Sequence, residues 1–382
     1  MKKLIRITTV PISLSGLLTG QLNFMKKHYN IIGVSSGGKG LEHVKKQEGI
    51  SIIPVEMTRS ITPLKDLKAL ISLYKILKKE KPFIVHSHTP KAGTLGMIAA
   101  KMAGVPHRLH TIAGMPLLEA TGIKRVILNY VEKITYKCAT KIYPNSHGLN
   151  TIILDNNFTQ PSKLKVLGNG SSNGIDTDYF NPSLFDKKSK KELRDSLGIK
   201  KGDYVFVFVG RLVSDKGINE LIKAFEKIAS QEKNVKLLLV GTFEKELDPL
   251  KKETEEYIIN AEYLIGVGWK KDVRPYFSIA DCLVFPSYRE GFPNVVMQAG
   301  AMGLPSIVSN INGCNEIIIN GENGFIIPPK NVEELYEKMT ILLKKSHATF
   351  SSEKCRNLIV NRYNRQFIWD EILKEYKALE SK

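Results

Sequence analysis

The chain has 382 residues, 42% hydrophobic and 25% charged, so it is long enough for two globular domains and too apolar for a disordered protein. Its net charge of +18 is concentrated in residues 1–175, which hold 25 Lys/Arg against 8 Asp/Glu, and the rest of the chain is nearly neutral. This excess favours an anionic partner, either nucleic acid or the acidic lipids of a membrane surface, unless the lysines are merely solvated.

The first half of the sequence alternates between strand and helix patterns. Its start, "MKKLIRITTVP", predicts a first strand ending at Pro11, since Arg6 and Pro11 interrupt any signal-peptide core. No apolar run reaches the roughly 18 residues typical of a membrane-spanning helix. Later, "KPFIVHSH" predicts a buried strand, "TPKAGTLGMIAAKMAG" a helix closed by Gly104, and "VPHRLHTIAG" the next strand.

The second half repeats this rhythm after a stretch rich in Gly, Ser, Asn, Pro and Lys. "DYVFVFVG", "NVKLLLVG" and "DCLVFPS" are apolar on both faces, which suits parallel strands covered by helices on each side. The predicted fold class is α/β, with two Rossmann-like, doubly wound domains facing each other across a cleft. We place the domains at 1–172 and 201–360, a linker at 173–200, and a final helix at 361–382 that returns to the first domain.

A pair of cations marks the first candidate site. "GRLVSDKG" places Arg211 and Lys216 on a tight turn between a strand and a helix, where they suit a diphosphate. A solvated charged loop is the alternative interpretation. Neither a dinucleotide-binding G-x-G-x-x-G nor a P-loop is present, and the four scattered cysteines predict core thiols rather than a zinc site.

A second anion-binding element is expected in "PSYREGFPNVVMQAGAMGLP". Pro293 suits the start of a helix, and the helix amino end offers N–H groups from Gly291, Phe292 and Asn294. Glu290 and Gln298 lie eight residues apart, about 12 Å along a helix. That span matches the distance from a sugar, past a diphosphate, to a ribose.

These motifs, with "NGENGFIIPP", "HSHTPKAGTLG" and "HRLHTIAGMPL", closely resemble the retaining GT-B glycosyltransferases of family 4 over essentially the whole chain. They look like the subgroup that builds capsular polysaccharide, exopolysaccharide or lipid-linked glycans, some members of which add N-acetylgalactosamine to a sugar on undecaprenyl diphosphate. No metal-ligand cluster is visible in the sequence, so we expect no metal or other cofactor. The resemblance implies a UDP-sugar donor and a glycan or polyprenyl-diphosphate-sugar acceptor. It also implies a cytoplasmic enzyme at the inner face of the membrane.

The resemblance also assigns roles to residues. Arg211 and Lys216 look like the pair that neutralises the leaving UDP diphosphate, and Glu290 like the first acid of the family's E-x7-E motif, which holds donor-sugar hydroxyls. The second acid falls at Gln298, whose amide is expected to bind the ribose in its place.

The first domain supplies further candidates. His110 matches a family position near the reacting sugar, although a strand-end histidine bonded to backbone is the alternative. Of His86 and His88 we expect only one to face the cleft, and we choose His88. Gly16 is expected to let the backbone approach the donor phosphates.

Two other functions remain open on the sequence alone. A non-hydrolysing UDP-sugar 2-epimerase has the same architecture, but it needs several cleft acids and lacks the "EGFPNVV" motif. A non-enzymatic nucleic-acid binder is suggested only by the net charge, without a helix-turn-helix, zinc-finger or RNP pattern. We therefore expect no nucleic-acid partner.

Overall fold

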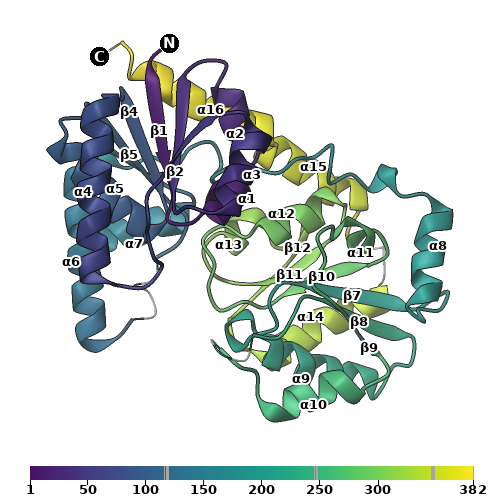
Figure 1. The fold of residues 1–382 in the computed structure, drawn as a ribbon. Coiled ribbons are helices and arrows are strands. Elements are labelled where there is room, and N and C mark those ends of the chain that lie inside the picture. Colours follow the sequence, from purple (N-terminus) through teal and green to yellow (C-terminus); the bar gives the residue numbers. More distant parts are fainter. Residues whose placement is uncertain (116, 118–119, 245, 247, 346–348, 382) are drawn as a thin grey trace. The chain divides into compact units, whose positions relative to one another are not determined.

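The computed structural model describes residues 1–115, 117, 120–244, 246, 248–345 and 349–381. The chain forms two compact units: unit 1 contains residues 1–174 and 365–382, and unit 2 contains residues 175–364 (Figure 1). Most of the predicted linker therefore belongs to unit 2, where it includes the helix α8 (Lys187–Ser196). The final helix α16 (Arg365–Ala378) belongs to unit 1.

Unit 1 is built on a parallel six-stranded sheet in the order β3-β2-β1-β4-β5-β6. Its strands are β1 (Lys3–Ile7), β2 (Asn30–Ser35), β3 (Ser51–Pro54), β4 (Ile84–His88), β5 (His107–Ile112) and β6 (Lys141–Pro144). One apolar cluster joins the sheet to α4 (Pro63–Glu80), α5 (Pro90–Met102), α6 (Gly122–Cys138) and α7 (His147–Asp155). A second cluster joins it to α16, α1 (Pro11–Leu17), α2 (Gln21–Met25) and α3 (Lys39–Glu48). Helices therefore cover both faces.

The first strand is shorter than predicted. It ends at Ile7, and Pro11 instead begins α1, because proline fits the first turn of a helix, where its missing N–H leaves no bond unmade. Among the described residues, no helix combines the length and apolarity needed to cross a bilayer.

Unit 2 repeats the architecture with a parallel sheet in the order β12-β11-β10-β7-β8-β9. Its strands are β7 (Tyr204–Val209), β8 (Val235–Val240), β9 (Leu264–Gly268), β10 (Cys282–Phe285), β11 (Ser306–Ser309) and β12 (Gly324–Ile327). Its other helices are α9 (Ile218–Ala229), α10 (Lys252–Asn260), α11 (Arg274–Ser278), α12 (Asn294–Ala301), α13 (Cys314–Ile317), α14 (Val332–Lys345) and α15 (Ser352–Tyr363). Buried runs such as "VFVFV" in β7 confirm the prediction of strands covered on both faces.

The strand order locates the expected ligand sites. In each sheet the chain winds outward in both directions from a central pair of strands, β1 and β4 in unit 1 and β7 and β10 in unit 2. Ligands of doubly wound sheets bind at the carboxyl ends of such a pair, because the connections leave it in opposite directions and open a crevice. The residues that follow β7 and β10 are therefore the place to look in unit 2.

Candidate active site

The loop after β7 is held tightly against the loop after β10. It contains a short 3-10 turn, Ser214–Lys216, that ends at Gly217 with a φ of +70°. A Cβ atom at Gly217 would lie 2.1 Å from the carbonyl oxygen of Pro286, so both the backbone conformation and the space require glycine. This approach brings Lys216 to the residues that follow β10.

Two further contacts lock these loops together. The amide of Tyr288 donates to the carbonyl oxygen of Asp215 at 2.9 Å, and the guanidinium of Arg289 lies 2.9 Å from the Asp215 carboxylate. The two loops therefore form one structure at the point where the sheet reverses its strand order.

Lys216 and Glu290 form an ion pair at the centre of this structure. The Lys216 ammonium lies 2.5 Å from Oε1 of Glu290, and their side chains are only 14% and 17% exposed. The hydroxyl of Ser287 donates to the same carboxylate oxygen at 3.0 Å. The sequence-predicted cation and the first acid of the E-x7-E motif are thus in direct contact, and Ser287 fixes the carboxylate.

Arg211 lies on the same loop but pairs with a different acid. Its guanidinium is 2.8 Å from the carboxylate of Glu244, in the loop after β8, and both side chains are partly exposed. This hydrogen bond raises the pKa of Arg211. Arg211 and Lys216 each hold a carboxylate that an incoming diphosphate would have to displace or share.

The loop after β11 holds the turn between Glu290 and α12 in place. The amide of Asn312 donates to the carbonyl oxygens of Glu290, at 2.5 Å, and Gly291, at 3.2 Å. A Cβ atom at Gly313, which has a φ of +78°, would lie 2.5 Å from the Gly291 carbonyl oxygen. These contacts fix the backbone of the turn at the amino end of α12, the end of a helix that favours anions.

The start of α12 differs from the prediction by one residue. Pro293 is the residue before the helix, which begins at Asn294, and the buried ring of Phe292 packs against Tyr363. Glu290 therefore precedes the helix, and only part of the path from Glu290 to Gln298 is helical. The expected rise of about 12 Å assumes helix over the whole segment, and that assumption does not hold for the turn that follows Glu290. Gln298 itself is half-buried within α12.

In unit 1, the expectation that His86 and His88 point to opposite faces of their strand is wrong. Both rings lie on the same face of β4 and stack with their centroids 4.4 Å apart, because residues two apart in a strand share a face. His88 accepts a 2.9 Å hydrogen bond from Arg6, and His86 lies 2.5 Å from the hydroxyl of Tyr376 on α16. Burial, followed by the nearby charges, holds both histidine pKa values well below their usual range, so both rings are neutral near pH 7.

His110 lies on the neighbouring strand β5, beneath α5. Its Nδ1 is 3.3 Å from the carbonyl oxygen of Ser87, and its ring fills the space that a side chain at Gly93 would need. The hydroxyl of Ser87 lies 3.0 Å from the same nitrogen, so Ser87 holds the ring through both its backbone and its side chain. Burial lowers the pKa of His110 to about 4. Its proposed place near the reacting sugar stays a prediction.

Gly16 lies inside the helix α1 rather than in a turn. The space around its Cα is open, since a Cβ atom there would meet no atom within 4 Å. The predicted approach of a phosphate to this backbone is therefore not blocked by protein, and it stays a prediction.

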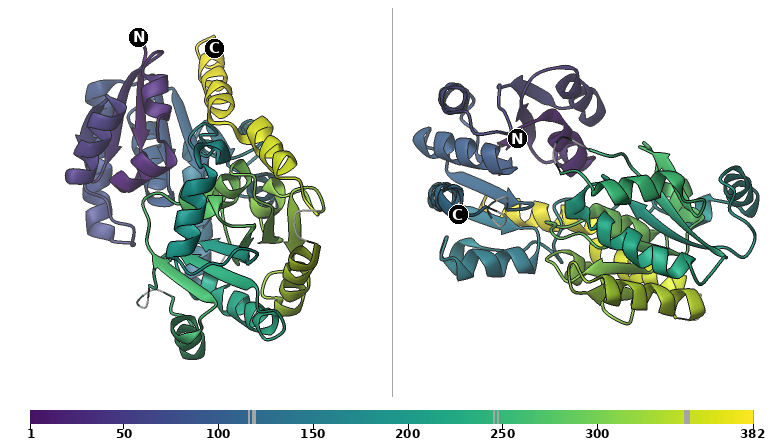
Figure 2. Two further views of the ribbon diagram at one scale, coloured as in Figure 1. Left: turned by 90° about the vertical axis from the view of Figure 1, so that its right-hand side faces the viewer. Right: turned by 90° about the horizontal axis from the view of Figure 1, so that it is seen from below.

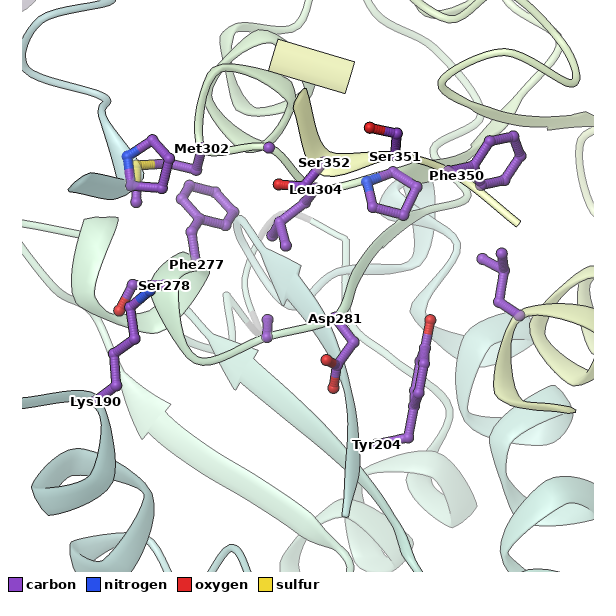
Figure 3. Close-up of a pocket in the computed structure, with 15 residues that line it drawn as sticks. Lys190, Tyr204, Phe277, Ser278, Asp281, Met302, Leu304, Phe350, Ser351 and Ser352 are labelled. Atoms are coloured by element: carbon purple, nitrogen blue, oxygen red, sulfur yellow. The ribbon is translucent and has the colours of Figure 1, made fainter. Parts of the chain in front are cut away.

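A cavity of about 300 Å³ lies at the other edge of the unit 2 sheet (Figure 3). The ring of Tyr204, the first residue of β7, points into it, and Asp281 and Leu304 line it beside the starts of β10 and β11. None of the predicted site residues lines this cavity. The predicted donor residues of unit 2 instead follow the carboxyl ends of the strands.

Sequence reasoning missed three residues of this site. Ser287 stands three residues before Glu290 in the same motif, a spacing that a turn motif could have suggested. Asn312 belongs to an Asn-Gly pair, which is a turn signal, three residues after the end of β11. Glu244 carries no local signal, because its contact with Arg211 depends on the pairing of β7 with β8.

Comparisons with known proteins agree with this geometry. Residues 189–365 match the family of glycosyl transferases group 1, and residues 15–146 match the glycosyl transferase 4-like family. The chain is 35% identical over 389 aligned positions to the capsular polysaccharide biosynthesis glycosyltransferase CapM of Staphylococcus aureus, covering 99% of this chain and 97% of that protein. It is 34% identical to the UDP-Gal:alpha-D-GlcNAc-diphosphoundecaprenol alpha-1,3-galactosyltransferase of Escherichia coli, over 81% of this chain and 78% of that protein.

Among solved structures, Anabaena Alr3699/HepE in complex with UDP superposes with a TM-score of 0.82 at 18% identity, over 99% of this chain and 100% of that chain. This likeness shows the fold, which is the GT-B architecture of two doubly wound units. The chain therefore belongs to the family 4-like, group 1 glycosyltransferases and is a glycosyltransferase with the GT-B fold.

Proposed function

We propose that this enzyme transfers a hexose or N-acetylhexosamine from a UDP-sugar, with retention of configuration, to a polyprenyl-diphosphate-linked glycan at the inner face of the membrane. The observation that carries the proposal is the contact of Lys216 with Glu290 at the switch point of the unit 2 sheet, with Arg211 on the same loop as Lys216 and with the amino end of α12 following Glu290. The activities of the relatives, capsule synthesis and transfer to a diphosphoundecaprenol-linked sugar, support the class of product and acceptor.

The donor diphosphate is placed between the two cations. It carries more charge than the Glu244 carboxylate, so it displaces Glu244 from Arg211 and takes up donors of Lys216 that Glu290 does not use. Glu290, held by Ser287, then receives hydrogen bonds from donor-sugar hydroxyls. Gln298 bonds the ribose as an uncharged donor and acceptor.

Transfer follows a front-face course in this proposal. The bond between the anomeric carbon and the β-phosphate oxygen breaks while the acceptor oxygen bonds to the same face of that carbon. The acceptor proton passes to the departing diphosphate oxygen, so no carboxylate nucleophile is needed. Arg211 and Lys216 stabilise the negative charge that grows on UDP, which is where a fixed charge lowers the barrier most.

A donor panel tests this function. UDP-Gal, UDP-Glc, UDP-GalNAc and UDP-GlcNAc are each offered with a synthetic polyprenyl-diphosphate sugar, and UDP release and the anomeric configuration of the product are recorded. The proposal expects acceptor-dependent UDP release from one donor and an axial product linkage. Conversion of a UDP-N-acetylhexosamine without any acceptor would instead indicate an epimerase, and an inverted linkage would remove the front-face course.

A further inference from the structure

Helices α4 and α6 flank α5 and form one layer over a single face of the unit 1 sheet (Figures 1 and 2). Each packs against the unit through a minor part of its surface. In α4 the buried positions are Ala69, Leu73 and Leu77, and in α6 they come only near its end, at Thr135, Tyr136 and Cys138. The first half of α6 therefore offers most of its circumference to solvent.

That half of α6 carries an apolar stripe. The side chains are spaced three, one and three residues apart, which places them on one face of the helix, and they are strongly exposed: Ile123 81%, Val126 67%, Ile127 50% and Tyr130 68%. An apolar stripe normally faces a protein core, so four such residues in water indicate a surface that something else covers.

Helix α4 repeats the pattern in the same place. Leu64, Leu67 and Ile71 are three and four residues apart and between 46% and 80% exposed, and Ile61 just before the helix is 64% exposed. Both helices run back from the carboxyl edge of the same sheet, so both apolar segments lie toward that edge. Two separate helices therefore present the same feature at the same end of one layer.

Basic residues continue both stripes. Lys133 and Lys137 follow Tyr130 on the exposed face of α6, and Lys75 and Lys78 follow Ile71 on that of α4. Together the two helices hold nine Lys/Arg and three Asp/Glu. Asp66 and Glu80, two of the three acids, are already neutralised by Lys91 and Lys3 at 2.6 Å and 2.7 Å, so the uncompensated charge is positive.

We propose that these stripes, which we call the α4–α6 surface, dock the enzyme on an anionic lipid bilayer. The apolar side chains enter the boundary between headgroups and acyl chains, and the lysines contact lipid phosphates, the arrangement expected of interfacial amphipathic helices. A second copy of the chain fits less well, because it would bring two sets of lysines together. The inference deepens the proposed function by naming the surface that meets the membrane holding its acceptor.

Vesicle flotation of the full chain tests the surface. The wild type is expected to float with vesicles that contain phosphatidylglycerol and to remain in the bottom fraction with vesicles of pure phosphatidylcholine. Replacing Lys133 and Lys137 by Gln should weaken binding about fivefold per lysine at low salt, with the loss vanishing at high salt. The pair Lys187 and Lys191 on α8 in unit 2 has the same spacing and serves as the matched control, with no loss expected.

The apolar contribution is tested without changing charge. Ile123→Gln with Tyr130→Gln should reduce partitioning at least about tenfold, whereas Ile259→Gln, at a residue 73% exposed on α10, should have no effect. All these side chains are exposed, so melting temperatures should stay unchanged. Should a double variant fail to fold, the single Tyr130→Trp variant remains, and its emission should shift to the blue on binding anionic vesicles.

Activity separates this inference from the proposed function. The α4–α6 variants should keep wild-type turnover on a water-soluble short-chain acceptor and lose it on an acceptor embedded in vesicles. Equal losses on both acceptors would make the surface part of the active site and overturn the inference. So would a wild type that does not float, or a wild-type dimer that the apolar variant dissociates without any loss of vesicle binding. Transfer to the soluble acceptor would stand in either of the latter cases.

Discussion

The most direct test of the donor site is the removal of Lys216. Its ammonium lies 2.5 Å from Glu290 and is largely shielded from solvent, so it acts at low local dielectric. At an effective dielectric constant of about 20, a charge about 4 Å away contributes about 4 kcal/mol. Loss of one preorganised donor to a developing charge costs about 10²- to 10³-fold in turnover. We therefore expect Lys216→Ala to lower kcat about 10²- to 10³-fold.

The loss should appear mainly in kcat, because the charge on the leaving diphosphate grows as the reaction proceeds. Initial rates of UDP release measure it, with melting temperature as the check on folding. Lys227→Ala is the matched control, since Lys227 is also paired with an acid of unit 2, Glu333, but on the helix α9 away from the two loops. If the kcat of the Lys216→Ala enzyme is within about threefold of the wild-type value, the cation pair has no part in the mechanism.

Other expectations follow from single contacts. Gly217→Ala should lower the melting temperature far more than Gly198→Ala, because both positions have positive φ but only the first would place a Cβ atom 2.1 Å from Pro286. Burial depresses the pKa of His110 to about 4, compared with about 6.5 in the unfolded chain. The free energy of unfolding should therefore be highest above about pH 6.5 and should fall by about 3 kcal/mol as the pH drops toward 4. A pH series of denaturant melts measures this loss. Turnover should survive EDTA, and a loss restored by a divalent ion would refute the metal-free proposal. Gln298→Glu should change kcat less than tenfold, as measured with UDP release, since both side chains accept hydrogen bonds from a ribose (about 1 kcal/mol apiece).

The elements were predictable where local pattern decides them. "VFVFV" in β7 is apolar on both faces because helices cover both, and "TPKAGTLGMIAAKMAG" became α5, with its Pro90 at the first turn. The two motifs and their resemblance to the family bring Lys216 and Glu290 into one hypothesis, and the structure shows them in contact. Lys216 and Glu290 are far apart in the sequence, but they follow the adjacent strands β7 and β10. The predicted fold class therefore sufficed to place them at the same edge of the sheet.

The errors arose where a detail of geometry was needed. The two histidines of β4 were assigned to opposite faces, although residues two apart in a strand share one. The prediction treats the Gly-Phe-Pro turn as helix, so its rise of 1.5 Å per residue does not apply to the segment between Glu290 and Asn294. The partner of Arg211 could not be found at all, since Glu244 reaches it only through the register of two strands.

The contacts of the proposed donor site imply that it is formed before any donor arrives. Gly217 packs under Pro286, Tyr288 is bonded to Asp215, and Asn312 holds the turn that follows Glu290. All of these residues belong to unit 2, so the placement of the two cations proposed to bind the diphosphate is set within unit 2. The excess positive charge, by contrast, belongs to unit 1, most of it on solvated lysines such as those of α4 and α6. The two proposals thus assign nucleotide recognition and attraction to an anionic surface to different units, so variants of the α4–α6 surface should leave UDP affinity unchanged.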